Sequence, residues 1–412
     1  MININGKPYQ QQDFSKRSDQ LSRIDELKKI ETTVIGVCLG NPFDLLSVLF
    51  YIHEAGGTVL LIHPETPLEN AVTLSQTAGC SYLIYHNYQE IHAVGGSSSF
   101  HRPAVLQYSS GTTGEPKLIE RTWDHIERET DYYNRKAYFD SSETPLILVP
   151  LVHSYGLGSG VLASLKRGSE PVIISERNPK YMAHLIKKIP QSVIYGTPFF
   201  FNLLFSLKDP ELKFHKVISS GAPLSEKLLA QLQNNSDEVF QQYGSTETGC
   251  MAIGKNLASP TDVGNPLDYL TVTIDNDQGP GEIKVAFDNK VIHTRDLGCI
   301  SHSGSLNIIS RMDDLINVGG QKVIPYEVET VIARMENVRE VVVYKTNHPI
   351  FGEAVKAMIV ASQSIPALMI KQECQKYLPP FKIPYRIEFV KEIPKTPNGK
   401  ISRKLLIEKE HE

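Results

Sequence analysis

The sequence has 412 residues, too many for one ordinary hydrophobic core, so two or more folding units are expected. Apolar residues make up 41% and charged residues 21%, and the formal net charge of −4 gives no reason to expect nucleic acid or an anionic membrane as a partner. The five cysteines include no C-x-x-C pair, and no apolar run approaches the roughly 18 residues of a membrane span, so a cytoplasmic protein is expected.

The first predicted elements alternate between strand and helix. Residues 33–39 form a short β-branched run, which predicts a buried strand. An apolar-periodic stretch over residues 45–54 predicts a helix that ends at Gly56-Gly57, and residues 58–62 predict the next strand. This rhythm predicts a βαβ unit within an open α/β sheet.

The later elements continue the alternation and then change character. Further strands are predicted over residues 105–108, 145–151, 172–175, 193–195 and 216–219. A β-rich stretch covers residues 279–309, and after Asp313 a helix at 326–335 and a strand at 341–344 begin a new αβ alternation. The predicted fold class is α/β. We expect a large N-terminal domain over residues 1–312, built of α/β subdomains and a β-rich portion, and a small mobile α+β C-terminal domain over residues 313–412.

A glycine-rich loop is the strongest single chemical signal. Residues 108–117 read Tyr-Ser-Ser-Gly-Thr-Thr-Gly-Glu-Pro-Lys and follow a predicted strand. Glycines let backbone N–H groups turn inward around an anion, hydroxyls add donors, and Lys117 adds charge. The loop is not a Walker A motif, because no G-K-[ST] is present. By composition alone, a polar surface loop is about as good an interpretation as a phosphate site.

The string is, however, similar to the phosphate loop of the acyl-adenylate-forming superfamily, which includes acyl-CoA synthetases, non-ribosomal adenylation domains and luciferases. Further segments resemble the motifs of this family in its order: Glu54-Ala55-Gly56-Gly57, Gly221-Ala222-Pro223-Leu224, Tyr243-Gly244-Ser245-Thr246-Glu247, Thr294-Arg295-Asp296-Leu297-Gly298, residues 311–320 and residues 394–403. The resemblance covers nearly the whole chain. It implies an enzyme that uses ATP and Mg²⁺ to activate a carboxylic acid and then passes the acyl group to a thiol.

The resemblance assigns a nucleotide site residue by residue. The residues that it implies for ATP or AMP are Ser109, Ser110, Gly111, Thr112, Thr113, Gly114, Lys117, Gly221, Ala222, Gln241, Tyr243, Thr246, Asp296 and Arg311. A flat ring at Tyr243 suits adenine, and Asp296 with Arg311 suits the ribose hydroxyls. Arg295 stands where the family has glycine, which puts the local backbone geometry in question.

The catalytic residues implied by the resemblance are Lys400, Glu247 and Thr246. Glu247 is the implied ligand of Mg²⁺, a hard cation that prefers carboxylate and phosphate oxygens. Lys400 would relieve the repulsion between the substrate carboxylate and the α-phosphate. Asp313 matches the hinge about which the family's C-terminal domain turns.

The acyl pocket implied by the resemblance contains His153, Ser154, Tyr155, Tyr195, Gly196, Phe199 and Gly244. For His153 alone, a core histidine is the competing interpretation. No carboxylate stands at residues 152–155 to hold a substrate amine, so an α-amino acid is disfavoured, and the aromatic residues at 195–201 suit a flat acid.

Within the superfamily the chain resembles the aryl-acid-activating enzymes of petrobactin-type siderophore pathways, down to its short first subdomain. This implies 3,4-dihydroxybenzoate as the acid and the phosphopantetheine thiol of an aryl or acyl carrier protein as the acceptor. The alternative is a stand-alone acyl- or aryl-CoA ligase, because the carrier and CoA end in the same thiol.

Three other classes of protein fit the sequence less well. A serine hydrolase requires G-x-S-x-G, and residues 156–160 place the serine one position late. A Rossmann dehydrogenase requires a glycine fingerprint that the sequence lacks. A degenerate regulatory homologue is disfavoured by Lys400, Glu247 and the intact glycine-rich loop.

Overall fold

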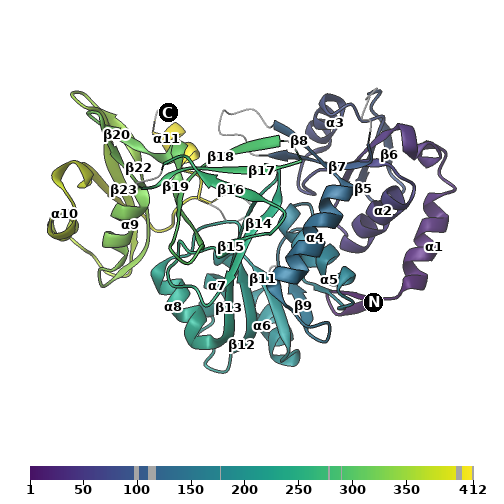
Figure 1. The fold of residues 1–412 in the computed structure, drawn as a ribbon, viewed down its shortest axis with the longest axis horizontal. Coiled ribbons are helices and arrows are strands. Elements are labelled where there is room, and N and C mark those ends of the chain that lie inside the picture. The colour runs from purple at the N-terminus through teal and green to yellow at the C-terminus, as the bar shows by residue number, and fades with distance from the viewer. Residues whose placement is uncertain are drawn as a thin grey trace. The chain divides into compact units, whose positions relative to one another are not determined.

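The structure, a computed structural model, describes residues 1–96, 102–109, 117–176, 178–276, 279–288, 290–395 and 401–410. The chain divides into two compact units (Figure 1). The first unit consists of Met1–Gly221, Ala230–Leu257 and Val263–Leu270. The second consists of Ala222–Leu229, Ala258–Asp262 and Thr271–Glu412. The predicted domain boundary at Asp313 lies inside the second unit, between its two sheets in sequence, and stays a prediction.

A six-stranded sheet forms the N-terminal part of the first unit. In sheet order its strands are β6 (Ile91–Ala93), β5 (Tyr82–His86), β3 (Val34–Leu39), β4 (Thr58–Leu61), β7 (Ala104–Ser109) and β8 (Lys117–Thr122). The four inner strands are parallel, and the two edge strands are antiparallel to their neighbours. Its helices are α1 (Gln11–Leu21), α2 (Pro42–Glu54) and α3 (Leu68–Thr77), with short 3-10 turns at Asp25–Leu27 and Ile30–Thr32. The predicted βαβ unit is thereby confirmed.

Helix α2 begins three residues before its predicted start. The side chain of Asn41 accepts hydrogen bonds from the backbone N–H groups of Phe43 and Asp44, and Pro42 occupies the first turn. The cap satisfies donors that the apolar periodicity alone does not reveal. At the other end Gly56 has a φ of +68°, which ends the helix where the glycine pair predicted.

A nine-stranded sheet forms the rest of the first unit. In sheet order its strands are β15 (Asn265–Pro266), β14 (Gly249–Lys255), β13 (Ser236–Ser245), β12 (Phe214–Ser219), β11 (Ser192–Gly196), β9 (Thr144–Ile147), β10 (Val172–Ile173), β1 (Ile2–Ile4) and β2 (Lys7–Tyr9). The strands from β13 to β1 are parallel. The helices that follow or connect them are α4 (Trp123–Ala137), the π-helix η3 (Tyr155–Leu162), α5 (Ala163–Lys166), α6 (Pro179–Lys188), α7 (Pro198–Phe205) and α8 (Glu226–Asn235). The strand predicted over residues 145–151 ends at Ile147, since the chain then turns toward η3.

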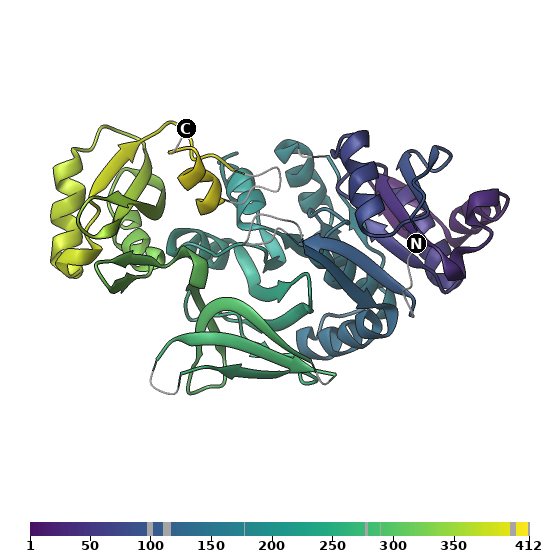
Figure 2. The same ribbon diagram turned by 90° about the horizontal axis from the view of Figure 1, so that it is seen from above.

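The second unit begins with a four-stranded antiparallel sheet. Its strands are β16 (Thr271–Ile274), β17 (Gly281–Phe287), β18 (Lys290–Ile300) and β19 (Leu306–Arg311). Figure 2 shows this sheet in green as a run of adjoining strands. It corresponds to the β-rich stretch expected over residues 279–309.

A five-stranded sheet completes the second unit. Its strands are β20 (Ile316–Val318), β21 (Gln321–Val323), β22 (Val338–His348), β23 (Gly352–Ala361) and β24 (Arg386–Phe389). The helical elements are the 3-10 turns η4 (Met312–Asp314) and η5 (Pro380–Lys382) and the helices α9 (Pro325–Ala333), α10 (Ala367–Tyr377) and α11 (Arg403–Glu408).

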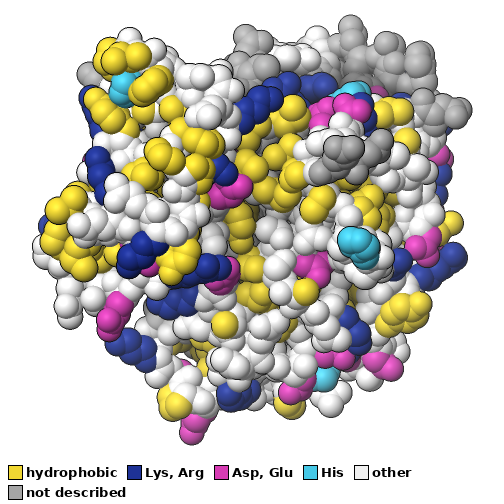
Figure 3. Space-filling model, turned by 60° about the vertical axis from the view of Figure 1, so that its left-hand side comes forward, with side chains coloured by type: hydrophobic (Ala, Val, Ile, Leu, Met, Phe, Trp, Pro, Cys, Tyr) yellow, Lys and Arg dark blue, Asp and Glu magenta, His cyan; other side chains and the backbone are white. Residues whose placement is uncertain are grey.

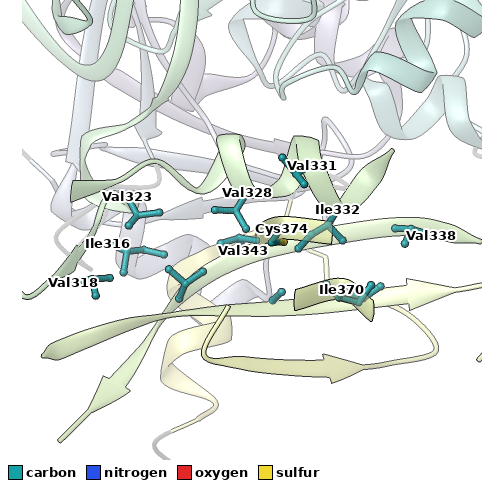
Figure 4. Packing of buried hydrophobic residues seen from close by; sticks show 13 residues of the cluster. Ile316, Val318, Val323, Val328, Val331, Ile332, Val338, Val343, Ile370 and Cys374 are labelled. Atoms are coloured by element: carbon teal, nitrogen blue, oxygen red, sulfur yellow. The ribbon is translucent and has the colours of Figure 1, made fainter. Parts of the chain in front are cut away.

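Alternation along β22 distributes this sheet's side chains between two cores. Val343 packs with residues of α9 and α10, including Val328 and Ile370, in the cluster drawn in Figure 4. Val342 and Tyr344 instead join a cluster that contains Leu406 of α11. Successive strand residues point to opposite faces, so helices cover both faces of the sheet.

The hairpin between β22 and β23 carries exposed apolar side chains. Ile350 is 80% exposed and Phe351 51%, and the ring of His348 stacks on that of Phe351 with centroids 4.8 Å apart.

Figure 3 shows a face of the molecule on which hydrophobic side chains lie among both basic and acidic ones. No single sign of charge dominates that face, in keeping with the small formal charge of the chain.

Candidate active site

Predicted pocket residues lie at the carboxyl ends of parallel strands in the first unit. Tyr195 and Gly196 end β11, and Ser219 ends the neighbouring β12. Carboxyl ends of strands in open α/β sheets are where ligands bind. Tyr195 is fully buried, and a Cβ on Gly196 would lie 2.9 Å from the Phe201 ring, so no side chain fits there. The sheet therefore brings these predicted residues together.

Tyr155 ties the ends of β11 and β12 to each other. Its hydroxyl donates to the carbonyl of Ile218 at 2.7 Å, and the carbonyl of Gly196 lies 3.3 Å away. Burial raises the pKa of Tyr155 well above its usual value, and nearby Tyr195 raises it further. Tyr155 therefore remains a neutral hydrogen-bond donor and fixes the spacing of the two strand ends.

His153 and Ser154 lie in the segment that leads into η3. His153 is exposed, and its ring centroid is 6.4 Å from that of His63. The side-chain amide of Gln107 in β7 donates to the carbonyl of Val152 at 2.5 Å. The exposure of His153 argues against the core-histidine interpretation. The role of His153 at the acyl pocket stays a prediction.

Phe199 lies in the first turn of α7, half-buried, with its ring 5.5 Å from that of Phe200. Helix α7 follows β11 directly, so Phe199 belongs to the same strand end as Tyr195 and Gly196.

The glycine-rich loop connects two paired strands. Ser109 ends β7, Lys117 begins β8, and the two residues face each other across the hairpin. The Ser109 hydroxyl lies 3.4 Å from the Lys117 carbonyl oxygen. The other predicted loop residues lie outside the described residues: Ser110, Gly111, Thr112, Thr113 and Gly114.

The strands β13 and β14 carry the residues predicted for adenine. Gln241 is buried in β13 opposite Ser219. Tyr243 is half-buried, and a β-bulge follows it, which turns the strand before Gly244. A Cβ on Gly244 would lie 2.2 Å from the carbonyl oxygen of Gly249, so only glycine fits.

Thr246 and Glu247 lie on the turn from β13 to β14, and both are half-buried. The hydroxyls of Ser245 and Thr248 are 3.1 Å apart, and Thr248 is fully buried. The turn is thus closed upon itself while it presents Thr246 and Glu247 at its tip. Among the residues described, no group of three or more His, Cys, Asp or Glu side chains is arranged to hold a metal ion.

Gly221 lies two residues after β12 and has a φ of +85°, a conformation that glycine adopts without strain. Before it, the Ser220 hydroxyl donates to the carbonyl of Gln242 at 2.9 Å. Ala222 follows, half-buried. The backbone of this predicted adenine-lining segment is therefore anchored to β13.

In the second unit, the two residues predicted for ribose form a pair. Asp296 in β18 and Arg311 in β19 face each other, and Arg311 Nε lies 2.9 Å from Asp296 Oδ1. The side chain of Asp296 is 11% exposed and that of Arg311 is 48% exposed. Thr294 supports Asp296, because its hydroxyl accepts from the Asp296 N–H at 3.1 Å.

Arg295 keeps a backbone conformation that favours glycine. Its φ is +58°, in the left-handed region, so the substitution for the family's glycine leaves the chain's course compatible with either residue. The guanidinium forms a two-bond ion pair with Asp313, with Arg295 Nε 3.1 Å from Asp313 Oδ2. The hydrogen bond to Asp313 raises the pKa of Arg295. The sequence predicted neither this ion pair nor its consequence: the side chain of Asp313, the predicted hinge residue, is paired with the Arg295 guanidinium.

Lys400 lies outside the described residues, but its flanks are described. Lys395 lies 2.8 Å from Glu340. Arg403 donates to the Val343 carbonyl at 2.8 Å, to Asp314 at 2.9 Å and to Glu329 at 2.6 Å. Arg403 therefore fixes the end of the predicted lysine segment to the second unit.

The sequence did not predict a buried ion pair that lies close to the turn at residues 246–248. Arg121 in β8 contacts Glu129 in α4, with the two side chains 3% and 1% exposed. A spacing of eight residues across a strand–helix junction carries no recognisable signal in the sequence. Only the packing of α4 against β14 shows where the carboxylate lies.

Comparison with known proteins defines the class to which this fold and site belong. The family model of AMP-binding enzymes matches residues 93–286, and the model of their C-terminal domain matches residues 327–400. The chain belongs to this family, and its predicted membership of the acyl-adenylate-forming superfamily is confirmed. It is an enzyme of the acid–thiol ligase class, since its relatives are such ligases.

One relative matches over almost its whole length. The chain is 38% identical to the 3,4-dihydroxybenzoate–[aryl-carrier protein] ligase of Bacillus anthracis, over 98% of each chain. It is 28% identical to a long-chain-fatty-acid–CoA ligase of Bacillus subtilis, over 76% of this chain and 62% of that protein.

Solved structures confirm the fold. ATP-bound MatB from Rhodopseudomonas palustris aligns with a TM-score of 0.87 at 20% identity, over 99% of this chain and 95% of that one. The o-succinylbenzoate-CoA synthetase MenE of Bacillus subtilis aligns with a TM-score of 0.82 at 20% identity, over 98% and 94%. The predicted α/β fold with a smaller C-terminal part is thus confirmed. Among the described residues, no helix has the length and apolar character needed to cross a membrane.

Proposed function

We propose that this enzyme adenylates an aryl carboxylic acid, best represented by 3,4-dihydroxybenzoate, and transfers the acyl group to a pantetheine thiol. The observation that carries the proposal is the similarity to a 3,4-dihydroxybenzoate–[aryl-carrier protein] ligase, which extends over 98% of both chains. The arrangement of strand-end residues in the first unit and of Asp296 with Arg311 in the second supports it.

In the first half-reaction a carboxylate oxygen attacks the α-phosphorus of ATP. A P–O bond forms, the bond from the α-phosphorus to the bridging oxygen of pyrophosphate breaks, and pyrophosphate leaves with the electron pair. Two anions meet in this step, so the protein must supply positive charge and fixed donors. In the second half-reaction a thiolate attacks the acyl carbon, a C–S bond forms, and AMP leaves with the oxygen that the acid contributed.

Residues of each unit, taken separately, suit one part of a nucleotide. Asp296 offers a carboxylate acceptor beside the half-exposed Arg311 guanidinium, a pair suited to two adjacent ribose hydroxyls. Half-buried Tyr243 presents an aromatic ring suited to a base. Gly221 has a left-handed φ, and Gly244 has no room for a Cβ, so both positions favour glycine. At these two positions no side chain covers the main chain.

Glu247 would hold Mg²⁺ together with phosphate oxygens, and Thr246 would donate to the α-phosphate. A nucleotide-bound Mg²⁺ is commonly held by one or two carboxylates plus phosphates, so the single half-buried carboxylate on this turn fits it. When bound, the ion withdraws charge from the phosphate oxygens.

Lys400 and Asp313 complete the proposal. Lys400 would bridge the substrate carboxylate and the α-phosphate in the first half-reaction. Asp313 would act as the hinge about which residues 313–412 turn, removing Lys400 before the thiol enters. The anchoring of Arg403 to Asp314 and Glu329 supports this, because it makes the lysine segment move with the C-terminal domain.

We propose that the acid binds in a pocket lined by His153, Ser154, Tyr195, Gly196, Phe199 and Gly244. Tyr155 would fix the strand ends that form the base of this pocket. Polar groups at one end would reward ring hydroxyls, since a polar site rejects analogues that leave it unpaired. A carrier protein is the proposed acceptor, in a siderophore pathway of the petrobactin type in the cytoplasm. All five cysteines are free, as a reducing compartment requires.

A panel assay tests the proposal. ATP–pyrophosphate exchange is measured with 3,4-dihydroxybenzoate, 2,3-dihydroxybenzoate, benzoate and octanoate, and the product is then offered a phosphopantetheinylated carrier protein or CoA. We expect fastest exchange with 3,4-dihydroxybenzoate and faster transfer to the carrier. Best exchange with octanoate would reject the aryl substrate but keep adenylation, and faster transfer to CoA would favour the CoA ligase alternative.

A further inference from the structure

The turn that carries Glu247 rests on a buried ion pair. Arg121 lies near the end of β8 and Glu129 lies in α4, and their side chains are 3% and 1% exposed. Arg121 Nη2 contacts Glu129 Oε2. Helix α4 packs against β14, the strand that the turn enters (Figure 1).

The second carboxylate oxygen of Glu129 binds the main chain of that strand. The N–H of Cys250 donates to Glu129 Oε1 at 2.6 Å. The acceptor is a carboxylate oxygen of a side chain that is 1% exposed, so the hydrogen bond is charge-assisted and holds the backbone N–H in place. Cys250 is three residues after Glu247, so the bond fixes the end of the turn.

Gly249 shows how closely the turn and the carboxylate approach each other. Its φ is +70°, and a Cβ built on it would lie 2.2 Å from Glu129 Oε2. Only glycine permits both this conformation and this contact. Strand β14 therefore begins in direct contact with the Glu129 carboxylate.

Stability alone is a poor reason for this pair. Removing two charges from water is costly, and well-packed apolar residues often stabilise a protein as much as a buried ion pair does. The two side chains are 3% and 1% exposed, so they offer almost no surface for binding substrate or exchanging a proton with it. What the pair does provide is a fixed anchor for one short stretch of backbone.

We infer that Glu129, whose buried charge Arg121 neutralises, is a positioning residue: its side-chain oxygen, by accepting from the Cys250 N–H, sets the course of the turn at residues 246–248 and so places the Glu247 carboxylate for Mg²⁺-ATP. The inference rests on the proposed function of Glu247. The inference gives the buried pair of Arg121 and Glu129 a role in Mg²⁺-dependent nucleotide binding, and not merely in stability.

The test compares two double variants that both remove the ion pair. Arg121→Met with Glu129→Gln keeps a side-chain oxygen that can accept from Cys250, whereas Arg121→Met with Glu129→Leu removes it. The measured quantity is the factor by which Mg²⁺ strengthens ATP binding, determined by calorimetry with and without the ion. We expect the Mg²⁺ factor of the Gln double variant to lie within about twofold of the wild-type value. The Mg²⁺ factor of the Leu double variant should be about tenfold lower than the wild-type value.

A matched control separates positioning from stability. Glu143 and Lys216 form another largely buried pair of the first unit, 2.6 Å apart. The double variant Glu143→Leu with Lys216→Met also removes the carboxylate that binds His215 and accepts from the Asp140 N–H, so it should lower the unfolding temperature but leave the Mg²⁺ factor unchanged. Gly249→Ala probes the same contact from the turn, and should reduce the factor even if a double variant does not fold.

Four outcomes would contradict the inference or the proposed function on which it rests. Equal Mg²⁺ factors for the Gln and Leu double variants overturn the inference, as does an equal loss in the control. Glu247→Gln is measured alongside: if it leaves the factor at the wild-type value, the proposed metal role of Glu247 fails and the inference fails with it. If Glu247→Gln abolishes the factor while both double variants and Gly249→Ala keep it, only the inference is rejected.

Discussion

Replacing Arg295 by glycine should change the balance between the two half-reactions with little effect on stability. The residue has a left-handed φ of +58° and an ion pair with Asp313. Glycine would relieve about 1–2 kcal/mol of backbone strain and would lose about 0.5–1 kcal/mol through its greater freedom in the unfolded chain. The pair's side chains are 53% and 31% exposed, so its loss costs only about 0.2–1 kcal/mol. These contributions nearly cancel, and the unfolding temperature should move by less than about 3 °C.

The effect on function follows from the same pair. Asp313 is the proposed hinge, and Arg295 holds it to β18 of the same unit. A restraint of up to about 1 kcal/mol changes the ratio of two domain orientations by up to about fivefold. The rate of ATP–pyrophosphate exchange and the rate of transfer from supplied acyl-adenylate to a thiol should therefore change relative to each other by about two- to fivefold.

Lys208→Gly is the matched control, because Lys208 is also a basic residue with a left-handed φ, +52°. It should leave the ratio of the two rates unchanged. The reasoning is refuted if Arg295→Gly and Lys208→Gly give the same ratio, or if Arg295→Gly lowers the unfolding temperature by more than about 10 °C.

Three further predictions concern single residues. Lys400→Ala should slow acyl-adenylate formation by about 10²–10³, the usual cost of losing one transition-state donor, but leave transfer from supplied acyl-adenylate within a few-fold of wild type; equal loss in both steps would contradict alternation of the domains. Tyr155→Phe removes a hydroxyl that donates to a backbone carbonyl at 2.7 Å, so it should cost about 1–3 kcal/mol of unfolding free energy and raise the KM for the acid more than that for ATP; a denaturant titration with an unchanged midpoint would reject this. Alkylation of the native protein at pH 8 should modify Cys299 first, because it is partly exposed and the other four cysteines are buried; early labelling of Cys38, whose pKa burial raises to about 11, in a mass-spectrometric time course would contradict the packing.

Short-range patterns predicted much of the fold. The β-branched run at residues 33–39 and the glycine pair at 56–57 are local signals, and the strand β3 and the end of α2 lie where they indicated. The start of α2 was missed because it depends on the Asn41 side chain, which binds two backbone N–H groups. Apolar periodicity does not register such a cap.

The site divides in the same way. Asp296 and Arg311 were assigned by motif, and the register of β18 against β19 explains how residues fifteen apart come to face each other. The contacts that act through space had no local signal. Arg295 with Asp313, and Arg121 with Glu129, join residues from different elements, so only tertiary packing identifies them.

The fate of one oxygen atom tests the central claim most directly. With 3,4-dihydroxybenzoate labelled with ¹⁸O in its carboxylate, the products of a complete turnover with ATP and a pantetheine thiol are analysed by mass spectrometry. An acyl-adenylate requires that the carboxylate oxygen bonded to the α-phosphorus leaves with AMP, so AMP should carry one labelled oxygen and pyrophosphate none. Label in inorganic phosphate accompanied by ADP, or unlabelled AMP, would show that the acid is not activated at the α-phosphate and would contradict the account.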